Sequence, residues 1–257
     1  MITVQIIGTG KVARQLAIRF RESVLITLKA IAGRDQHACG NIRDLVSDTV
    51  ICTDLDSLLS TDIIILAVTD TAIATVSDKI DARGALVLHT SGSVPMAALK
   101  NHKRYGVLYP LQSFSESNRV DWDTVPVCIE AHTVSDLDIV RTIASVLSPK
   151  IFEVTTAQRK HLHVAAVFAN NFANHCFTMA QEICEKHTIP FELLHPLILE
   201  TATKAITQEP DKSQTGPAMR GDKEIILAHL ETLDTEPKEI YRVLTNAITH
   251  YYGRKKL

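Results

Sequence analysis

The 257-residue sequence has few aromatic residues and almost no net charge. Phe, Trp and Tyr make up 5% of the chain, and 27 basic against 29 acidic residues leave a formal net charge of −2. This balance gives no attraction to nucleic acid or to an acidic membrane surface, so we expect neither as a partner. No apolar run reaches the roughly 18 residues that a membrane-spanning helix requires.

Cysteine is also scarce, and its spacing matches no known framework. The five cysteines are scattered and include no Cys-x-x-Cys pair. We therefore expect reduced thiols in a cytoplasmic protein, without a targeting peptide before the first apolar segment. The 11 histidines are dispersed, so no metal site is expected.

Apolar segments of strand length alternate with helical patterns up to residue 154, which indicates a parallel sheet covered on both faces. We therefore predict an α/β protein with a Rossmann, doubly wound parallel sheet at residues 1–154. The expected strands are 2–7, 25–32, 49–52, 62–68, 85–89, 105–109, 125–130 and 151–154, with helices at 12–20, 55–60, 72–80 and 134–147.

The pattern changes after residue 154. Residues 157–186 contain neither proline nor glycine, and their apolar positions recur at helical spacing, which predicts one long helix. Further helices are expected at 192–207, 222–233 and 237–252. Residues 155–257 should thus form a smaller all-helical domain for substrate binding and dimerisation, and the long apolar helix favours a homodimer.

The most informative motif follows the first apolar run and contains two glycines in a tight spacing. Such a turn between a strand and a helix holds the pyrophosphate of a dinucleotide, because glycine permits the turn and a close approach of backbone N–H groups. A purely structural turn is the alternative. The predicted cofactor residues here are Gly8, Thr9, Gly10, Lys11, Val12 and Ala13.

The end of the second predicted strand bears on cofactor choice. An acidic residue at this place binds the ribose 2′-hydroxyl of NAD, whereas an arginine accommodates the 2′-phosphate of NADP. Arg34 stands at the tip and Asp35 follows it. We expect NADP, with NAD possible if Arg34 is only a solvated loop charge and Asp35 takes the hydroxyl.

Polar residues also follow the later strands, where an open parallel sheet binds its ligands. Val68, Thr69 and Asp70 should pass near the nicotinamide ribose. Ser91 lies in a Thr-Ser-Gly-Ser cluster that suits a substrate carboxylate or carbonyl, although a turn and helix cap explain the same residues.

Candidates on the substrate side come from the predicted helical domain. At 100° per residue, His163, Asn170 and Asn174 fall on one side of the long helix, and His163 is a candidate proton donor. Alternatively, these polar side chains form a solvated stripe on the helix or make hydrogen bonds within a dimer. Arg220, in a loop, is suited to an anionic substrate or to a local salt bridge.

Five motifs together carry a family resemblance. They are the glycine turn, Leu88–Ser93, Tyr109–Gln112, His163–Asn171 and Gly216–Asp222. This combination resembles a bacterial family of Rossmann-like oxidoreductases with a C-terminal domain of unknown function, within the superfamily of 6-phosphogluconate and 3-hydroxyacid dehydrogenases. The resemblance implies the fold and a nicotinamide cofactor, but no substrate.

One position departs from the hydroxyacid dehydrogenases. Their long helix carries a catalytic lysine three residues before a paired asparagine, and Val167 stands there in this sequence. Proton transfer then falls to His163, His89 or Tyr109, or the reaction needs little of it, as imine reduction does.

The sequence thus predicts an NADP-dependent oxidoreductase that moves a hydride to or from a small carboxylate-bearing substrate, an oxo acid, hydroxy acid or imine. The missing lysine supports a second hypothesis, a non-catalytic NADP-binding sensor or scaffold dimer. A third is a structural helical dimer with a vestigial glycine turn.

Overall fold

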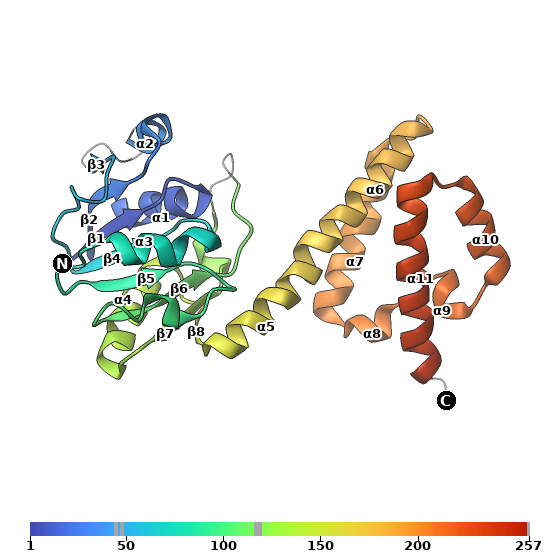
Figure 1. Cartoon of the computed structure of the whole chain (residues 1–257). Coiled ribbons are helices and arrows are strands. Elements are labelled where there is room, and N and C mark those ends of the chain that lie inside the picture. Colours follow the sequence, from blue (N-terminus) through green and yellow to red (C-terminus); the bar gives the residue numbers. More distant parts are fainter. Residues whose placement is uncertain (44–45, 47–48, 116–119, 256–257) are drawn as a thin grey trace. The chain divides into compact units, whose positions relative to one another are not determined.

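The computed structural model describes residues 1–43, 46, 49–115 and 120–255, and it divides into two compact units, 1–170 and 171–257 (Figure 1). The domain boundary expected after residue 154 falls within the first unit, just before a helix that begins at Thr156. That boundary stays a prediction.

The first unit is built on an eight-stranded sheet in the order β3-β2-β1-β4-β5-β6-β7-β8. Neighbouring strands run parallel except β6 and β7, and this confirms the predicted Rossmann-type α/β fold. The strands are β1 (Ile2–Ile7), β2 (Ile26–Ala32), β3 (Val50–Cys52), β4 (Ile63–Leu66), β5 (Leu86–His89), β6 (Tyr105–Pro110), β7 (Val127–Ala131) and β8 (Ile151–Glu153).

The antiparallel pairing of β6 and β7 corrects the expectation of a wholly parallel sheet. A parallel return needs a crossover over the face of the sheet, commonly a helix. In the described part of the segment between these strands, the regular element is the short 3-10 turn η3 (Trp122–Thr124). The chain therefore turns back beside β6, pairing Gly106 with Ala131.

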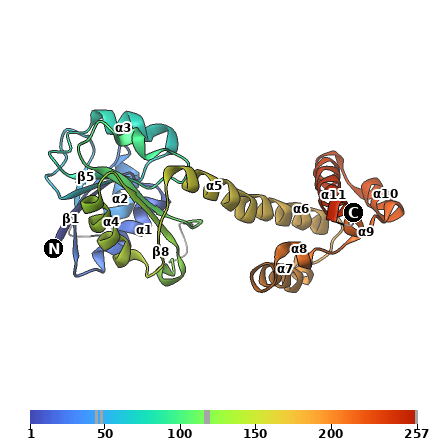
Figure 2. The same ribbon diagram turned by 90° about the horizontal axis from the view of Figure 1, so that it is seen from below.

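Helices cover both faces of the sheet. Helices α1 (Lys11–Arg21) and α4 (Val134–Leu147) pack on one face, and α3 (Ile73–Lys79) with the 3-10 turns η1 (Asp70–Ala72) and η2 (Met96–Leu99) lies on the other (Figure 2). Two separate hydrophobic clusters fill these layers, because alternate residues of each strand face opposite sides. Helix α2 (Gln36–Arg43) follows β2.

The helix predicted at residues 55–60 is wrong. Residues 55–57 form a bend and a turn, and residues 58–60 have no regular structure. The Asp54 carboxylate accepts a hydrogen bond from the Ser57 N–H at 2.7 Å, and such local bonds compete with helix formation.

The long helix begins where Thr155 and Gln158 form a reciprocal capping box. It continues as α5 (Thr156–Ala166), the π-helical segment η4 (Val167–Phe172) and α6 (Ala173–Lys186). The predicted angles assumed 100° per residue throughout, and the wider π turn breaks that rule. The alignment of His163 with Asn170 and Asn174 therefore does not follow from the spacing.

The second unit is all-helical, as expected. Two short helices add to those expected. Helix α8 (Pro210–Ser213) lies where no helix was predicted, and α9 (Pro217–Arg220) lies in the predicted loop that contains Arg220. No helix in the described part of the chain combines the length and the apolar character that spanning a membrane requires. After α6 come η5 (Phe191–Leu194), α7 (His195–Thr207), α8 (Pro210–Ser213), α9 (Pro217–Arg220), α10 (Lys223–Thr232) and α11 (Thr235–Lys255).

Candidate functional site

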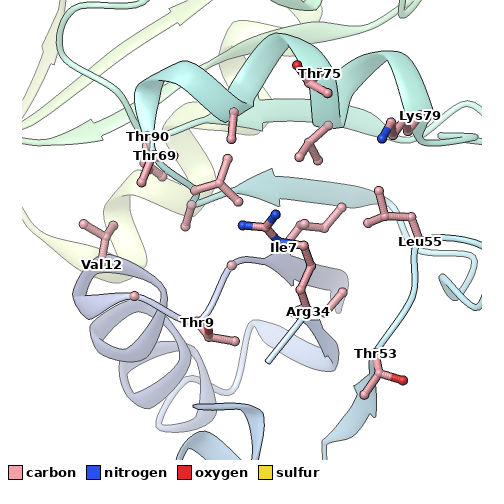
Figure 3. A pocket seen from close by; sticks show the side chains of 18 of the residues that line it. Ile7, Thr9, Val12, Arg34, Thr53, Leu55, Thr69, Thr75, Lys79 and Thr90 are labelled. Carbon is pink, nitrogen blue, oxygen red and sulfur yellow. The ribbon is translucent and has the colours of Figure 1, made fainter. Parts of the chain in front are cut away.

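A cavity of about 660 Å³ opens beyond the carboxyl ends of β1, β2, β3 and β4 (Figure 3). Its size falls in the range of small-molecule pockets, roughly 300–1,000 Å³. Threonine side chains, Arg34 and Lys79 provide polar groups around a mostly apolar lining. Figure 3 shows Thr75 and Lys79 on α3 at one side, with Thr9 and Val12 at the start of α1 on the other.

The turn after β1 has the backbone that a pyrophosphate site needs. Gly8 adopts a φ of +131°, and a Cβ there would lie 2.1 Å from the Ala67 carbonyl oxygen, so only glycine fits. A Cβ on Gly10 would meet nothing within 4 Å. Helix α1 has no capping side chain and no acidic residue in its first turn, which leaves its N-terminus suited to an anion.

Most of the predicted cofactor residues border this cavity. Ala13 is instead fully buried in the hydrophobic core, where it lets α1 pack closely. Asp70 also lies outside the lining, and its carboxylate accepts a hydrogen bond from the Ser93 hydroxyl. Those that line the cavity are Gly8, Thr9, Gly10, Lys11, Val12, Arg34, Val68 and Thr69.

Arg34 and Asp35 have different surroundings. Arg34 lines the cavity. Asp35 is outside the lining, and its carboxylate accepts hydrogen bonds from the N–H groups of His37 at 2.8 Å and Ala38 at 3.2 Å. Asp35 therefore caps the start of α2, and Arg34 is the charged residue of this strand end that borders the cavity.

Sequence reasoning missed one wall of the cavity. Ala72, Thr75, Val76 and Lys79 all line it from η1 and α3. Their spacing of i, i+3, i+4 and i+7 marks one face of a helix, and this signal was present in the sequence. Further lining residues that it missed are Thr53, Asp54 and Leu55, whereas Thr90 belongs to the Thr-Ser-Gly-Ser cluster that the sequence had singled out.

Ser91 is held inside a tight turn after β5. Its hydroxyl accepts hydrogen bonds from the N–H groups of Ser93 at 3.1 Å and Val94 at 3.0 Å, and its own N–H donates to His89 Nδ1. Burial lowers the pKa of His89 to about 4, so the ring is a neutral acceptor at pH 7. These contacts favour the structural explanation of the Thr-Ser-Gly-Ser cluster.

A buried arginine that the sequence did not reveal supports the same turn. Arg159 on α5 has no exposed surface, and its guanidinium donates to the carbonyl oxygens of Ser91, Gly92 and Val94. It also forms an ion pair of 3.1 Å with Glu130 on β7. Arg159 thus fixes the turn after β5 to the start of the long helix.

Of the four predicted substrate residues, Ser91, His163 and Asn170 belong to the first unit and Arg220 to the second. His163 is half-buried on α5 and contacts Tyr109, with 3.3 Å between Nδ1 and the hydroxyl oxygen. Asn170 is exposed in the π-helical segment. Arg220 belongs to the second unit, where it forms a 2.7 Å salt bridge with Asp222.

Among the described residues, no cluster of His, Cys, Asp and Glu is arranged to hold a metal ion.

Comparison with known proteins identifies a matching family and similar structures. Residues 125–248 match a family described as a domain of unknown function, DUF2520. A crystal structure from Bacteroides fragilis, of a protein provisionally named an NADP oxidoreductase, has 34% identity and a TM-score of 0.90, with 97% of this chain and 98% of that chain covered. No curated protein matches the chain by sequence.

More distant structures share the fold. Protein TM1727 from Thermotoga maritima has 22% identity and a TM-score of 0.73, covering 99% of this chain and 100% of its own. An imine reductase variant from Myxococcus stipitatus, solved with NAD+, has 14% identity and a TM-score of 0.58, covering 99% and 94%. The chain therefore belongs to the Rossmann-like oxidoreductase family whose C-terminal region is the domain of unknown function DUF2520.

Proposed function

We propose that the protein is an NADP-dependent oxidoreductase that transfers a hydride to or from a small carboxylate-bearing substrate, an oxo acid, hydroxy acid or imine. The observation that carries this proposal is the glycine turn, which opens with an uncapped helix N-terminus into the cavity. The provisional name of the Bacteroides fragilis protein and the NAD+ complex of the imine reductase support the same cofactor class.

The residues present fit such a cofactor. Gly8 and Gly10 would let the pyrophosphate approach the N-terminus of α1, and Thr69 would lie beside the nicotinamide ribose. When bound, the nicotinamide supplies or accepts the hydride. The protein contributes orientation and charge, and the mostly apolar walls exclude water.

Arg34 is the basis for proposing NADP. It lines the cavity, whereas Asp35 caps α2. A guanidinium paired with the 2′-phosphate makes a charge-assisted hydrogen bond of roughly 1.5–3 kcal/mol. NAD lacks this phosphate, so we expect NADP to bind more tightly.

On the substrate side we propose His163, Asn170, Ser91 and Arg220. Ser91 and His163 belong to the first unit, and Arg220 belongs to the second. We further propose a cytoplasmic homodimer that associates through the helical domain. Exposed apolar side chains on α7, among them Leu197 and Leu199, support this association.

A second candidate is a non-catalytic NADP sensor or scaffold. Val167 stands where the hydroxyacid dehydrogenases have a lysine, and the Ser91 hydroxyl is engaged by two backbone N–H groups. Such a protein would bind the oxidised and reduced cofactor with different affinities and transfer no hydride.

Calorimetric titration with NADPH and NADH tests the proposal. We expect tight NADPH binding, and Arg34→Ala should weaken it ten- to a hundredfold while NADH binding changes little. Arg83→Ala is the matched control, because Arg83 is exposed, pairs with Asp81 and lies outside the cavity lining. Unchanged NADPH affinity in Arg34→Ala would overturn the NADP preference, and binding of neither nucleotide would leave a structural dimer.

With binding established, reduction of pyruvate and 1-pyrroline-5-carboxylate by NADPH tests turnover. These probes represent the oxo acid and imine classes. Different affinities for the two redox forms, with no turnover across oxo acid and imine panels, would favour the sensor.

A further inference from the structure

Tyr109 and His163 form a hydrogen-bonded pair between the sheet and the long helix. Tyr109 lies at the carboxyl end of β6 and His163 on α5, with 3.3 Å between the hydroxyl oxygen and Nδ1 and the rings in edge contact at 6.3 Å between centroids. Both side chains are half-buried, so each retains access to solvent or ligand.

Gly92 makes room for this pair. A Cβ at this position would lie 2.6 Å from His163 Nδ1, 2.7 Å from Tyr109 Cζ and 2.8 Å from the Tyr109 hydroxyl oxygen. The turn after β5 therefore passes directly against the two polar atoms. Arg159 holds the Gly92 carbonyl oxygen at 3.2 Å, which fixes the turn in that position.

The turn after β5 connects the pair to the cavity. Thr69 and Thr90 line the cavity at the end where the nicotinamide is proposed to lie, and Gly92, which lies against both side chains of the pair, follows Thr90 by two residues. Tyr109 and His163 are not themselves among the lining residues. Tyr109 is thus a hydroxyl donor in contact with the turn that borders the proposed nicotinamide site.

The surroundings keep Tyr109 protonated. Burial raises its pKa to about 12, and Cys128 on β7 and Asp70 act in the same direction. The positive charge of Arg159 on α5 opposes them. Burial also raises the pKa of the Cys128 thiol, so Cys128 is neutral at pH 7. Tyr109 therefore holds its proton across the physiological range.

We propose that Tyr109 delivers the proton that accompanies hydride transfer, and that His163 restores it. This inference rests on the proposed function. In the direction of reduction, the Tyr109 O–H bond breaks and an O–H or N–H bond forms on the carbonyl oxygen or imine nitrogen. The hydride from the reduced nicotinamide supplies both electrons. The Tyr109 oxygen then takes a proton from His163 Nδ1 while His163 Nε2 takes one from water, which leaves as hydroxide, so charge and atoms balance.

The chain offers a matched control on the same strand. Tyr105, at the opposite end of β6, places its hydroxyl oxygen 3.1 Å from His132 Nδ1 and stacks on that ring. Tyr105→Phe and Tyr109→Phe each remove one hydroxyl from a tyrosine–histidine pair. The second pair contacts the turn after β5, which begins at Thr90 of the cavity lining.

The first experiment needs neither cofactor nor substrate. We would record the ring ¹⁵N resonances of His163 by NMR in the full chain. Tyr109→Phe should shift the Nδ1 resonance of His163, Tyr105→Phe should leave it in place, and Gly92→Ala should displace it through the added Cβ. A His163 spectrum that is unchanged in both Tyr109→Phe and Gly92→Ala overturns the pair.

The second experiment measures proton delivery during turnover with NADPH and pyruvate or 1-pyrroline-5-carboxylate. Tyr109→Phe should lower kcat on the order of 100-fold with NADPH affinity and KM nearly unchanged, and Tyr105→Phe should match the wild type. Tyr109→Phe with wild-type kcat overturns the proton role. Absence of NADPH binding in the wild type overturns the proposed function instead, and the NMR comparison still decides whether the pair exists.

Discussion

The two units differ in how much apolar surface each buries by itself. The first contains two hydrophobic clusters, one on each face of the sheet. Among the described residues of the second unit, Cys184 and Ala218 are the buried hydrophobic side chains. The second unit also exposes large apolar groups, which include Leu193, Leu197, Leu199, Ile206, Leu227 and Val243.

This difference follows from architecture. A mostly parallel sheet covered by helices on both faces completes its own core. Helices that carry apolar stripes without a sheet between them need another surface to cover those stripes. The first unit therefore holds a cavity beside a complete core, and the second is the more suitable unit for association with another chain, as the proposed dimer requires.

The largest expected effect is the loss of a buried charge in the first unit. Arg159→Met removes the cation paired with Glu130, which keeps its hydrogen bonds from Thr156, and the donor to three carbonyl oxygens. Breaking a buried ion pair costs on the order of 3–5 kcal/mol of unfolding free energy. Urea unfolding followed by circular dichroism measures this loss. Arg220→Met is the control in the second unit, where the exposed pair with Asp222 should contribute less than about 1 kcal/mol. Equal losses in the two variants would contradict the comparison.

Lowering the pH should reduce the stability of the first unit by a smaller amount. The pKa of His89 is lowered from 6.5 to about 4, mainly by burial and also by the charge of Arg159. Between these values the unfolded chain binds a proton that the folded protein does not take up, so stability falls as the pH drops through this window. At pH 5 the loss from His89 is about 2 kcal/mol relative to neutral pH.

The test compares the wild type with His89→Asn at both pH values. The Asn oxygen replaces Nδ1 as the acceptor for the Ser91 N–H but does not titrate. The other titrating groups are present in both proteins and cancel in the difference. A variant that loses as much stability at pH 5 as the wild type would show that His89 has no part in the acid sensitivity.

The smallest effect belongs to the surface of the second unit. Glu200 and Lys204 form an exposed i,i+4 ion pair of 2.8 Å on α7. Glu200→Gln should cost only about 0.3–0.5 kcal/mol in urea unfolding, and added salt should reduce that difference further. A loss of stability above about 2 kcal/mol would show that this face of α7 is buried in solution, contrary to the exposure of the ion pair.

Local patterns predicted the fold well because the relevant signals are short in sequence. The strand Ile63–Leu66 and the helix Val134–Leu147 follow from apolar runs and helical spacing. The direction of β7 depends on a long connection, whose path no local pattern encodes. The bend and turn at residues 55–57 depend on one side-chain contact of Asp54, and periodicity does not register that contact.

The residues of the candidate site were likewise predicted where the signal is local in sequence and missed where it is not. The glycine turn and Arg34 were predicted because each lies directly after a strand of recognisable pattern. Arg159 was not, because its partners are far away in sequence and an arginine on a helix is ordinarily solvated. Gly92 is informative only once Tyr109 and His163 are seen against it.

Trp122, the single tryptophan of the chain, allows the unfolding of the two units to be followed separately by spectroscopy. It is buried in the first unit, with its ring centroid 5.9 Å from that of Phe114. Tryptophan fluorescence therefore reports the opening of the first unit alone, whereas circular dichroism follows the helices of both. If the two signals change at different urea concentrations, the units unfold independently, and if they coincide, the long helix transmits the loss of one unit to the other.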